Sequence, residues 1–398
     1  MSSNIKDRVL IAIDNSKDTL VELSHRIHAQ PELAFHEQKT AALLCSFLEE
    51  RNFKVTRGYG GLETAFYAEA RGKAERPKVA FLAEYDALKG IGHGCGHNII
   101  ATCAVGAFIG AAAAVTEQDG SVCIIGTPAE EGGGGKVTML ENGAFDGVDF
   151  ALMIHPTAGK SMIGRGGRAA VVVTVSFRGR NAHSSDPSKG INALNALLNL
   201  FAAIDMMRPS MPLGANVNGI VTHGGEAANI IPGYSCGEFS VRAHTLHDLK
   251  NIVKIIRQCV ESSEKLTGTK AEMEIGRYYG ERYPNRPLGE AFKANMALLG
   301  EEMFYPTPNM QYGSSDIGNV SIKLPAIHEY LSIAQAGINA HSADFAEAAL
   351  SPRADQVCIL GAKGLAMTAM DVLTNAKLRQ EALESHEKQI PDIYKHES

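Results

Sequence analysis

The sequence contains no tryptophan, and aromatic residues occupy only 6% of its 398 positions. Proteins that bind nucleobases or sugars by stacking depend on aromatic side chains, so this composition argues against both kinds of surface. The formal net charge is -6 and no long basic run is present, which argues against nucleic acid or an anionic membrane as the main partner. We therefore expect neither a nucleic-acid nor a membrane partner.

A disulfide pattern and a secretory signal are also lacking. The seven cysteines are odd in number and scattered, so they do not make a disulfide framework and they fit a reducing compartment. The first residues, M-S-S-N-I-K-D-R, do not have the basic-then-apolar order of a signal peptide. Residues 99–115 are the only candidate membrane span, but they are rich in Ala and Gly and fall just short of the ~18 apolar residues that a span requires. We expect a buried helix there and a cytoplasmic protein.

Three short apolar runs alternate with helical patterns in the first part of the chain. The runs cover residues 79–82, 122–126 and 150–154. Helices are expected at 99–115, where Asn98 is a good N-cap, and near 137–141, and two more helices are expected before residue 50. Strands that alternate with helices predict a mostly parallel sheet with helices on both faces.

The pattern changes near Arg165. Strands at 170–177, 217–222, 235–243 and 271–278 alternate with helices at 191–207 and 246–266, which is the βαββαβ order of a ferredoxin-like α+β domain. A helix at 288–300, a strand at 329–333 and a helix at 353–374 follow, and the charged tail after Lys377 is expected to be a helix end and a frayed terminus. The predicted fold is an α/β catalytic domain of residues 1–167 and 282–398, interrupted by an inserted α+β domain of residues 168–281.

Side chains that can bind a metal follow each of the three apolar runs. They are Asp86, Cys95 and His97 after the first run, Glu130 and Glu131 after the second, and His155 after the third. The carboxyl ends of parallel strands meet at one edge of a sheet, so we expect these residues to converge in one crevice. Taken singly, a histidine after a strand is usually structural and a Glu-Glu pair usually faces solvent. The three fragments together predict a metal site.

The donor types indicate which metal this site would hold. Thiolate, imidazole and carboxylate together favour Zn²⁺ or another borderline transition ion over Mg²⁺ or Ca²⁺. We expect one or two divalent ions per subunit, with Zn²⁺ as the first candidate and Mn²⁺ or Co²⁺ as alternatives. The donors outnumber those of one tetrahedral site, which favours two ions that share a bridging ligand. Adjacent glutamates on an extended backbone point in opposite directions, so one can bind metal while the other acts as a general base.

Several sequence motifs, in order along nearly the whole chain, carry a family resemblance. They are E-Y-D-A-L, G-H-G-C-G-H-N, P-A-E-E-G-G, M-I-H-P, R-N-A-H-S, A-A-N-I-I-P and A-H-S-A-D-F. Together they resemble the M20 metallopeptidase and amidohydrolase family, and they look closest to its branch of aminoacylase-1-like amidohydrolases, dipeptidases and aminobenzoyl-glutamate hydrolases. The resemblance implies a zinc-peptidase-like catalytic domain and an inserted domain that acts as a lid and joins two subunits into a homodimer.

The resemblance also implies roles for residues of the catalytic domain. The metal ligands would be Cys95, His97, Glu131, His155 and His341. Glu130 would be the general base, and Asp86 would orient a ligand imidazole. Most family members have His-x-Asp after the first strand, whereas here Glu84 stands at the histidine position and Cys95 takes over as a ligand. This departure leaves open whether one or two ions bind.

Further roles are implied for the inserted domain and for one loop. His183 would reach the active site of the neighbouring subunit and stabilise the oxyanion. Asn229 and Arg242 would contact the carbonyl and the carboxylate of the substrate, the latter through bidentate hydrogen bonds, although Arg242 fits an ordinary strand-face residue equally well. Gly313 and Ser314 would line the substrate pocket.

The predicted function is that of a metal-dependent hydrolase that cleaves an amide or peptide bond next to a free carboxylate, using metal-activated water and a glutamate base. The substrate would be a small molecule: a dipeptide, an N-acyl amino acid or an aminobenzoyl-glutamate-like compound. Two alternatives stay open, an aminopeptidase that acts on longer peptides and a non-catalytic binding relative that keeps the fold.

Overall fold

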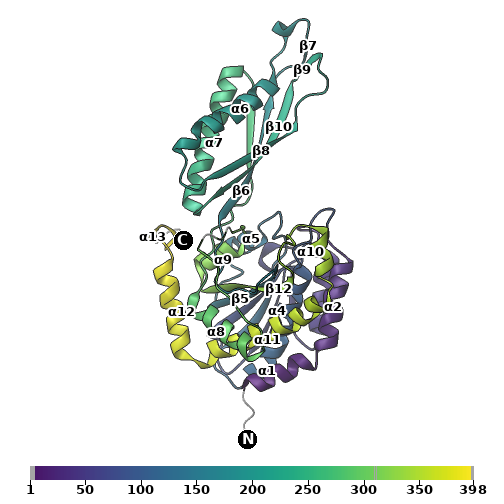
Figure 1. Ribbon diagram of the computed structural model, residues 1–398, viewed down its shortest axis with the longest axis vertical. Helices are drawn as coiled ribbons and strands as arrows, with labels where there is room; N and C mark the ends of the chain where they lie inside the picture. Colours follow the sequence, from purple (N-terminus) through teal and green to yellow (C-terminus); the bar gives the residue numbers. More distant parts are fainter. Residues whose placement is uncertain (1–4, 309, 311, 396–398) are drawn as a thin grey trace. The chain divides into compact units, whose positions relative to one another are not determined.

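The computed structural model describes residues 5–308, 310 and 312–395 of the chain. They form two compact units, each with its own sheet and helices (Figure 1). The first, here called the catalytic unit, extends to Gly167 and resumes at Arg282, and the second, here called the inserted unit, spans Arg168–Glu281.

The catalytic unit is built on a six-stranded sheet with the order β1-β2-β4-β3-β5-β12. Its strands are β1 (Val55–Arg57), β2 (Phe66–Arg71), β3 (Lys78–Ala83), β4 (Ser121–Gly126), β5 (Phe150–Ala158) and β12 (Ala326–Ala334). The four strands β4, β3, β5 and β12 run parallel, whereas β1 and β2 are added antiparallel at one edge. The predicted α/β fold with a mostly parallel sheet is confirmed.

Both faces of this sheet are buried, each under its own hydrophobic core. Successive side chains of a strand point to opposite faces and therefore enter different cores. In β3, Phe81 and Ala83 enter the larger core, whereas Ala80 and Leu82 enter the smaller one. Helices that contribute to the larger core are α1 (Ile5–Asp14), α2 (Lys17–Ala29), α3 (Gln38–Glu49), α4 (His97–Val115), α8 (Arg286–Leu298), α10 (Ala343–Ala348), α11 (Pro352–Thr374) and α12 (Ala376–Gln389). Those that contribute to the smaller core are α5 (Gly135–Glu141) and α9 (Ile317–Lys323).

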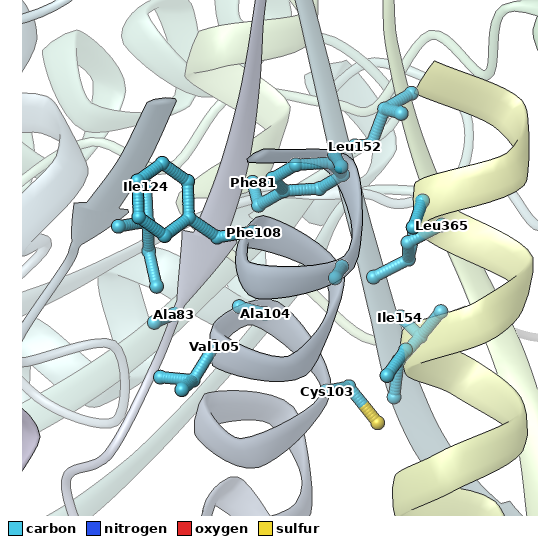
Figure 2. Packing of buried hydrophobic residues seen from close by; sticks show 14 of the residues in the cluster. Phe81, Ala83, Cys103, Ala104, Val105, Phe108, Ile124, Leu152, Ile154 and Leu365 are labelled. Carbon is cyan, nitrogen blue, oxygen red and sulfur yellow. The ribbon is translucent and has the colours of Figure 1, made fainter. Parts of the chain in front are cut away.

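Helix α4 is the centre of the larger core. Its side chains are apolar on all sides, and Phe108 and Val105 pack against the sheet while Cys103 lies toward α11 (Figure 2). Both α4 and α11 are long and apolar enough to cross a membrane by length and composition, but 83% and 78% of their most apolar windows are buried inside the protein. The expectation of a single candidate span was therefore wrong, and the expectation that residues 99–115 form a buried helix is correct.

The start of the chain differs from the prediction. It contains three helices instead of two, because α1 is separated from α2 by a short turn and buries only Val9 and Ile13, too few residues for a clear periodic signal. Asn98 does not cap α4, which begins one residue earlier, after Gly96 in the left-handed region at φ 71°. The amide of Asn98 instead donates to Ser24 Oγ at 2.9 Å and joins α4 to α2.

The end of the described chain is also more ordered than predicted. Helix α12 (Ala376–Gln389) starts where the Asn375 side chain accepts the backbone N–H of Leu378 at 3.1 Å, and it buries Leu378 and Ala382. A short helix, α13 (Asp392–Lys395), follows. Charged residues dominate this sequence, so the two buried apolar positions give little sign that the helix packs on the protein.

The inserted unit is a four-stranded antiparallel sheet with the order β11-β6-β10-β8, covered by two helices. The elements are β6 (Ala169–Arg178), α6 (Ala193–Met207), β8 (Asn216–His223), β10 (Tyr234–Ala243), α7 (Leu246–Thr267) and β11 (Lys270–Ile275). This order confirms the predicted βαββαβ plan. A two-stranded arm of β7 (Ala182–His183) and β9 (Ile230–Ile231) is an addition that the sequence did not indicate.

Candidate metal centre

Loops at one edge of the catalytic sheet bring metal-binding side chains together. Four groups of three described side chains each have donor atoms that all lie within 4.8 Å of one another. They are Cys95–His97–His155, Cys95–Glu131–His341, His97–Glu130–Glu131 and Glu84–Glu130–Asp316. Cys95 belongs to both of the first two groups, so its thiol lies close to both sets of donors.

Two backbone features place Cys95 and His341. Gly96 packs so closely on Pro156 that an added Cβ would lie 2.6 Å from Pro156 Cγ, so the glycine loop can rest directly against the end of β5. The backbone N–H of His341 donates to the Gly94 carbonyl at 2.9 Å, and His341 itself has a left-handed φ of 65°. Non-glycine residues adopt this region at a cost, and such strain concentrates at functional sites.

Two histidines of the centre are oriented by hydrogen bonds at their Nδ1 atoms. The Nδ1 of His97 lies 2.9 Å from the Asp86 carbonyl and 3.1 Å from Asp86 Oδ1, and the Nδ1 of His155 lies 2.6 Å from the Pro156 carbonyl. A carbonyl oxygen only accepts, so both Nδ1 atoms must donate, and in the neutral ring this leaves Nε2 as the acceptor. Metal-binding histidines are commonly oriented in this way. Burial lowers the pKa of His155 to about 3, which keeps the ring neutral.

The two adjacent glutamates lie in a turn and not on the extended backbone that the sequence suggested. Ala129 has a left-handed φ of 62°, and its carbonyl accepts the N–H groups of Gly133 and Gly135 at 3.2 Å. Both side chains share one group with His97. In addition, Glu131 groups with Cys95 and His341, whereas Glu130 groups with Glu84 and Asp316.

A buried lysine that the sequence analysis missed lies beside Glu130. Lys136, fully buried, donates to Glu84 and, at 2.8 Å, to Asp316 Oδ1, while its backbone N–H donates to Asp316 Oδ2 at 2.8 Å. Burial alone would lower the pKa of Lys136, but the charges of Asp316 and Glu84 outweigh it and raise that pKa. The lysine directly follows four glycines, where nothing in the sequence separates it from a surface lysine.

The unsatisfied atoms of the centre fit a metal cation. Glu84 Oε2, His97 Nε2 and Glu131 Oε1 are buried and have no hydrogen-bond partner among the described residues. Burial, together with the nearby charge of Glu131, raises the pKa of the Cys95 thiol, so without a cation the thiol stays protonated. Buried acceptors and charges without partners are costly, and a divalent ion would satisfy them together. The donor set therefore fits the predicted metal.

Comparison with known proteins places the chain in a family. Residues 163–266 match the family model of the peptidase dimerisation domain of M20 proteins. The Xaa-Arg dipeptidase of Homo sapiens is 35% identical over 395 residues, which cover 94% of this chain and 90% of that protein. The chain belongs to the M20 family. It is accordingly a hydrolase that acts on amide bonds.

Two further M20-type relatives cover the chain nearly end to end. A p-aminobenzoyl-glutamate hydrolase chain of Escherichia coli (strain K12) is 26% identical and covers 94% of this chain and 93% of its own length. The crystal structure of the Bacillus subtilis YXEP protein, a dinuclear metal-binding peptidase from the M20 family, superposes with a TM-score of 0.68 and 20% identity over 90% of this chain and 99% of that one. This likeness confirms the two-domain fold.

The remaining predicted residues of this M20 chain lie partly in the inserted unit. His183 and Asn229 lie together on the arm, where the Ser184 N–H donates to the Asn229 carbonyl at 2.9 Å. Arg242 pairs with Ala170 near the far end of β10 from that arm, eight residues or about 26 Å beyond Tyr234. Within the inserted unit, Arg242 therefore lies far from His183 and Asn229.

The predicted pocket-lining residues belong to the catalytic unit. Gly313 and Ser314 precede Asp316 in the loop before α9, and the space where a Gly313 side chain would stand is open. Asp316, which holds Lys136, connects this loop to the metal centre.

The first prediction concerns Cys95. A Cys95→Ser variant should bind Zn²⁺ more weakly and shift its metal preference toward Mn²⁺ or Co²⁺, because a harder oxygen replaces the thiolate. Isothermal titration of metal-free protein with each ion measures both effects. Cys103→Ser is the matched control, since the Cys103 thiol is buried in α4 and contacts the Cys358 carbonyl at 3.4 Å. Unchanged metal binding by Cys95→Ser would show that Cys95 is only a packing residue.

The second prediction concerns Glu37, which holds the turn that carries the two glutamates. Its carboxylate accepts the N–H of Ala129 at 2.9 Å and the hydroxyl of Thr64 at 2.9 Å, and burial raises its pKa to about 7. Since the folded pKa lies above the ordinary 4.5, the native state binds this proton more tightly than the unfolded chain does. Stability from this group is therefore full below pH 4.5 and lost as the pH rises through 7.

Glu37→Gln keeps an acceptor for Ala129 and removes the titration. Metal-free Glu37→Gln should be more stable than the metal-free wild type at pH 8, by on the order of 1–3 kcal/mol, with little difference at pH 4.5. Urea unfolding at the two pH values measures this, with Glu63→Gln at an exposed position as the control. An equal stability difference at both pH values would contradict the assignment.

Proposed function

We propose that this M20 enzyme is a metal-dependent dipeptidase that cleaves small dipeptides with a free carboxylate, with a basic C-terminal residue as the first class to test. The observation that carries the proposal is the placement of Glu130, which shares a group with the predicted ligands His97 and Glu131 but belongs to neither group that contains Cys95. The choice of a basic residue rests on the alignment with the human Xaa-Arg dipeptidase over nearly the whole chain.

The metal would be held by the donors that already converge. His97 and His155 with Cys95 would form one site, and Glu131 and His341 with Cys95 the other, which accommodates one ion or two. The mixed sulfur, nitrogen and oxygen donors support Zn²⁺, with Mn²⁺ or Co²⁺ as alternatives. When bound, such an ion polarises the substrate carbonyl and lowers the pKa of water.

Glu130 would be the general base. Burial raises its pKa well above the ordinary value, and the charges of Glu84, Glu131 and Asp316 raise it further. A carboxylate of raised pKa takes a proton from the attacking water more readily and can pass it to the leaving amine. Asp86 supports this chemistry by holding the His97 ring, and its own pKa is lowered because the contacts with His97 outweigh its burial.

His183 would act from the neighbouring subunit of a homodimer. Its Nδ1 accepts the backbone N–H of Ser185 at 3.2 Å, so Nε2 carries the proton on an exposed ring that can donate to a developing oxyanion. The dimer is supported by the match to the dimerisation domain and by the apolar side chains on the outer side of α6, where Leu198 is 52% exposed and Met206 is 71% exposed. A two-fold contact would place each arm at the other subunit.

The third prediction separates the roles of the adjacent glutamates. Glu130→Gln should lower kcat on alanyl-arginine by about 10²-fold or more with unchanged metal content, because it removes the proton acceptor and keeps the ligands. Glu131→Gln should instead lose metal. Mass spectrometry of bound metal and an assay of released arginine measure both. Near-normal turnover by Glu130→Gln would refute its role, and failure of the wild type on dipeptides and N-acyl amino acids alike would refute the proposed function.

The fourth prediction concerns the composite site. Glu130→Gln and His183→Ala proteins should each be nearly inactive, but a mixture that exchanges subunits should regain activity, because one site of each heterodimer has both residues intact. Activity after mixing, with mass spectrometry of the heterodimer, measures this. Ser188→Ala, another exposed position in the inserted unit, is the control and should stay active alone. A mixture that exchanges and stays inactive would exclude the cross-subunit role.

A further inference from the structure

Two arginines of the catalytic unit lie against the same aromatic ring, beside a predicted metal ligand. The Cζ atoms of Arg165 and Arg282 are 3.8 Å and 5.5 Å from the centroid of Tyr330, and the Tyr330 and His155 rings have centroids 5.4 Å apart. Tyr330 of β12 also pairs in register with His155 of β5. The arginines therefore lie next to the His155 side of the metal centre.

Arg282 makes four hydrogen bonds within the protein. Its Nε donates to the Arg165 carbonyl at 3.1 Å, and its two terminal nitrogens donate to the Gly166 carbonyl, to Tyr330 Oη at 3.0 Å and to His328 Nδ1. A guanidinium that donates its hydrogen bonds to the backbone and to neighbouring side chains has a structural role. The backbone of Arg282, which begins the second segment of the catalytic unit, also pairs with that of Gly167, which ends the first segment.

Arg165 is not engaged in this way. Within the described part of the chain its guanidinium makes one hydrogen bond, a long one of 3.4 Å from Nη1 to Thr157 Oγ1, and its Nε is buried without a partner. No described carboxylate pairs with it. Burial lowers the pKa of Arg165, yet a guanidinium remains charged at neutral pH. A half-buried charge with four unused N–H donors is costly unless a ligand completes its hydrogen bonds.

His328 supplies a second unused donor in the same cluster. It is 4% exposed, and its ring lies 5.3 Å from the His155 ring and 5.1 Å from the Tyr330 ring. Because Arg282 can only donate, His328 Nδ1 must accept, so Nε2 carries the proton. That N–H is also buried without a partner among the described residues. Two buried donors that lack a partner among the described residues define a place for a negatively charged group.

We propose that Arg165, with the Nε2–H of His328 as a second donor, binds the carboxylate of the substrate in the catalytic unit. The inference rests on the proposed function and deepens it. In a dipeptide the scissile carbonyl carbon and the terminal carboxylate carbon are separated by only three bonds of about 1.3–1.5 Å each, so the group that binds the carboxylate must adjoin the metal ligands. Arg165 meets that requirement because it lies against the Tyr330 ring, which is next to the ring of the predicted ligand His155. Its planar guanidinium can bind a carboxylate with two parallel hydrogen bonds.

The test compares alanyl-arginine with alanyl-argininamide, which lacks the carboxylate. The wild type should favour the acid by about 10²-fold in kcat/KM, because losing a charge-assisted contact costs roughly that factor. Arg165→Met should reduce this preference to less than about 10-fold by raising KM for the acid, with kcat, metal content and turnover of the amide nearly unchanged. Arg165→Lys, which keeps the charge without the bidentate geometry, should give an intermediate ratio.

Two arginine controls locate the effect. Arg168→Met changes the same residue type three positions later, where the side chain donates to the Gly214 carbonyl, and it should keep the wild-type ratio. Arg242→Met tests the alternative in which the inserted unit binds the carboxylate. Loss of the acid preference in Arg242→Met with retention in Arg165→Met would overturn the proposal.

The remaining outcomes are equally decisive. Equal acid preference in the wild type and Arg165→Met would overturn the assignment of Arg165 while leaving the proposed function intact. A wild type that cleaves acid and amide equally well would overturn carboxylate recognition itself. A wild type that cleaves neither compound nor any N-acyl amino acid would instead refute the proposed function. If Arg165→Met does not fold, as judged by thermal unfolding, the ratio measured for Arg165→Lys decides: the wild-type value overturns the proposal.

Discussion

The structure depends on the burial of several carboxylates at one edge of the catalytic sheet. Glu84, Glu130 and Asp316 have oxygen atoms within 4.8 Å of one another, and like charges that close together are unstable away from water. Lys136 supplies a fixed positive charge on one side of this cluster. On the other side, toward Cys95, the matching charge would come from a metal ion. The active centre is thus balanced by one cation that the chain carries and by others that it would bind.

This arrangement explains why Glu84 can stand where most family members have a ligand histidine. Its Oε1 is held by Lys136, and its Oε2 lies 3.7 Å from His97 Nε2, the ring nitrogen that would bind a metal. A carboxylate in this position adds negative charge near the predicted metal site and near the predicted base. Lys136 limits that charge, and the glycine run before it lets the chain turn sharply enough for its backbone N–H to reach Asp316.

Two residues of the metal centre have a strained backbone conformation. Ala129 and His341 both adopt left-handed conformations. Ala129 directly precedes Glu130 in the glutamate turn, and His341 is a predicted metal ligand. Such residues persist only where the surroundings hold them in place. Here a buried carboxylate, Glu37, accepts the Ala129 N–H, and the Gly94 carbonyl accepts the His341 N–H. The rigid parallel sheet and the two buried helices α4 and α11 provide the support that this strain requires.

Much of this protein could be predicted from its sequence. The apolar runs before Glu84, Glu130 and His155, the βαββαβ order and the motif set identified both the fold and the family, because hydrophobic periodicity and metal-binding motifs are local signals. Tertiary structure decided the rest. Nothing near Lys136 or His328 in sequence marks them as buried, and Arg165 resembles any loop arginine until its unused donors are seen beside Tyr330. The partners Glu84 and Asp316 are separated from each other by more than half of the chain. Burial and hydrogen bonding across such separations depend on how strands pack and not on neighbouring residues, so only the folded chain reveals them.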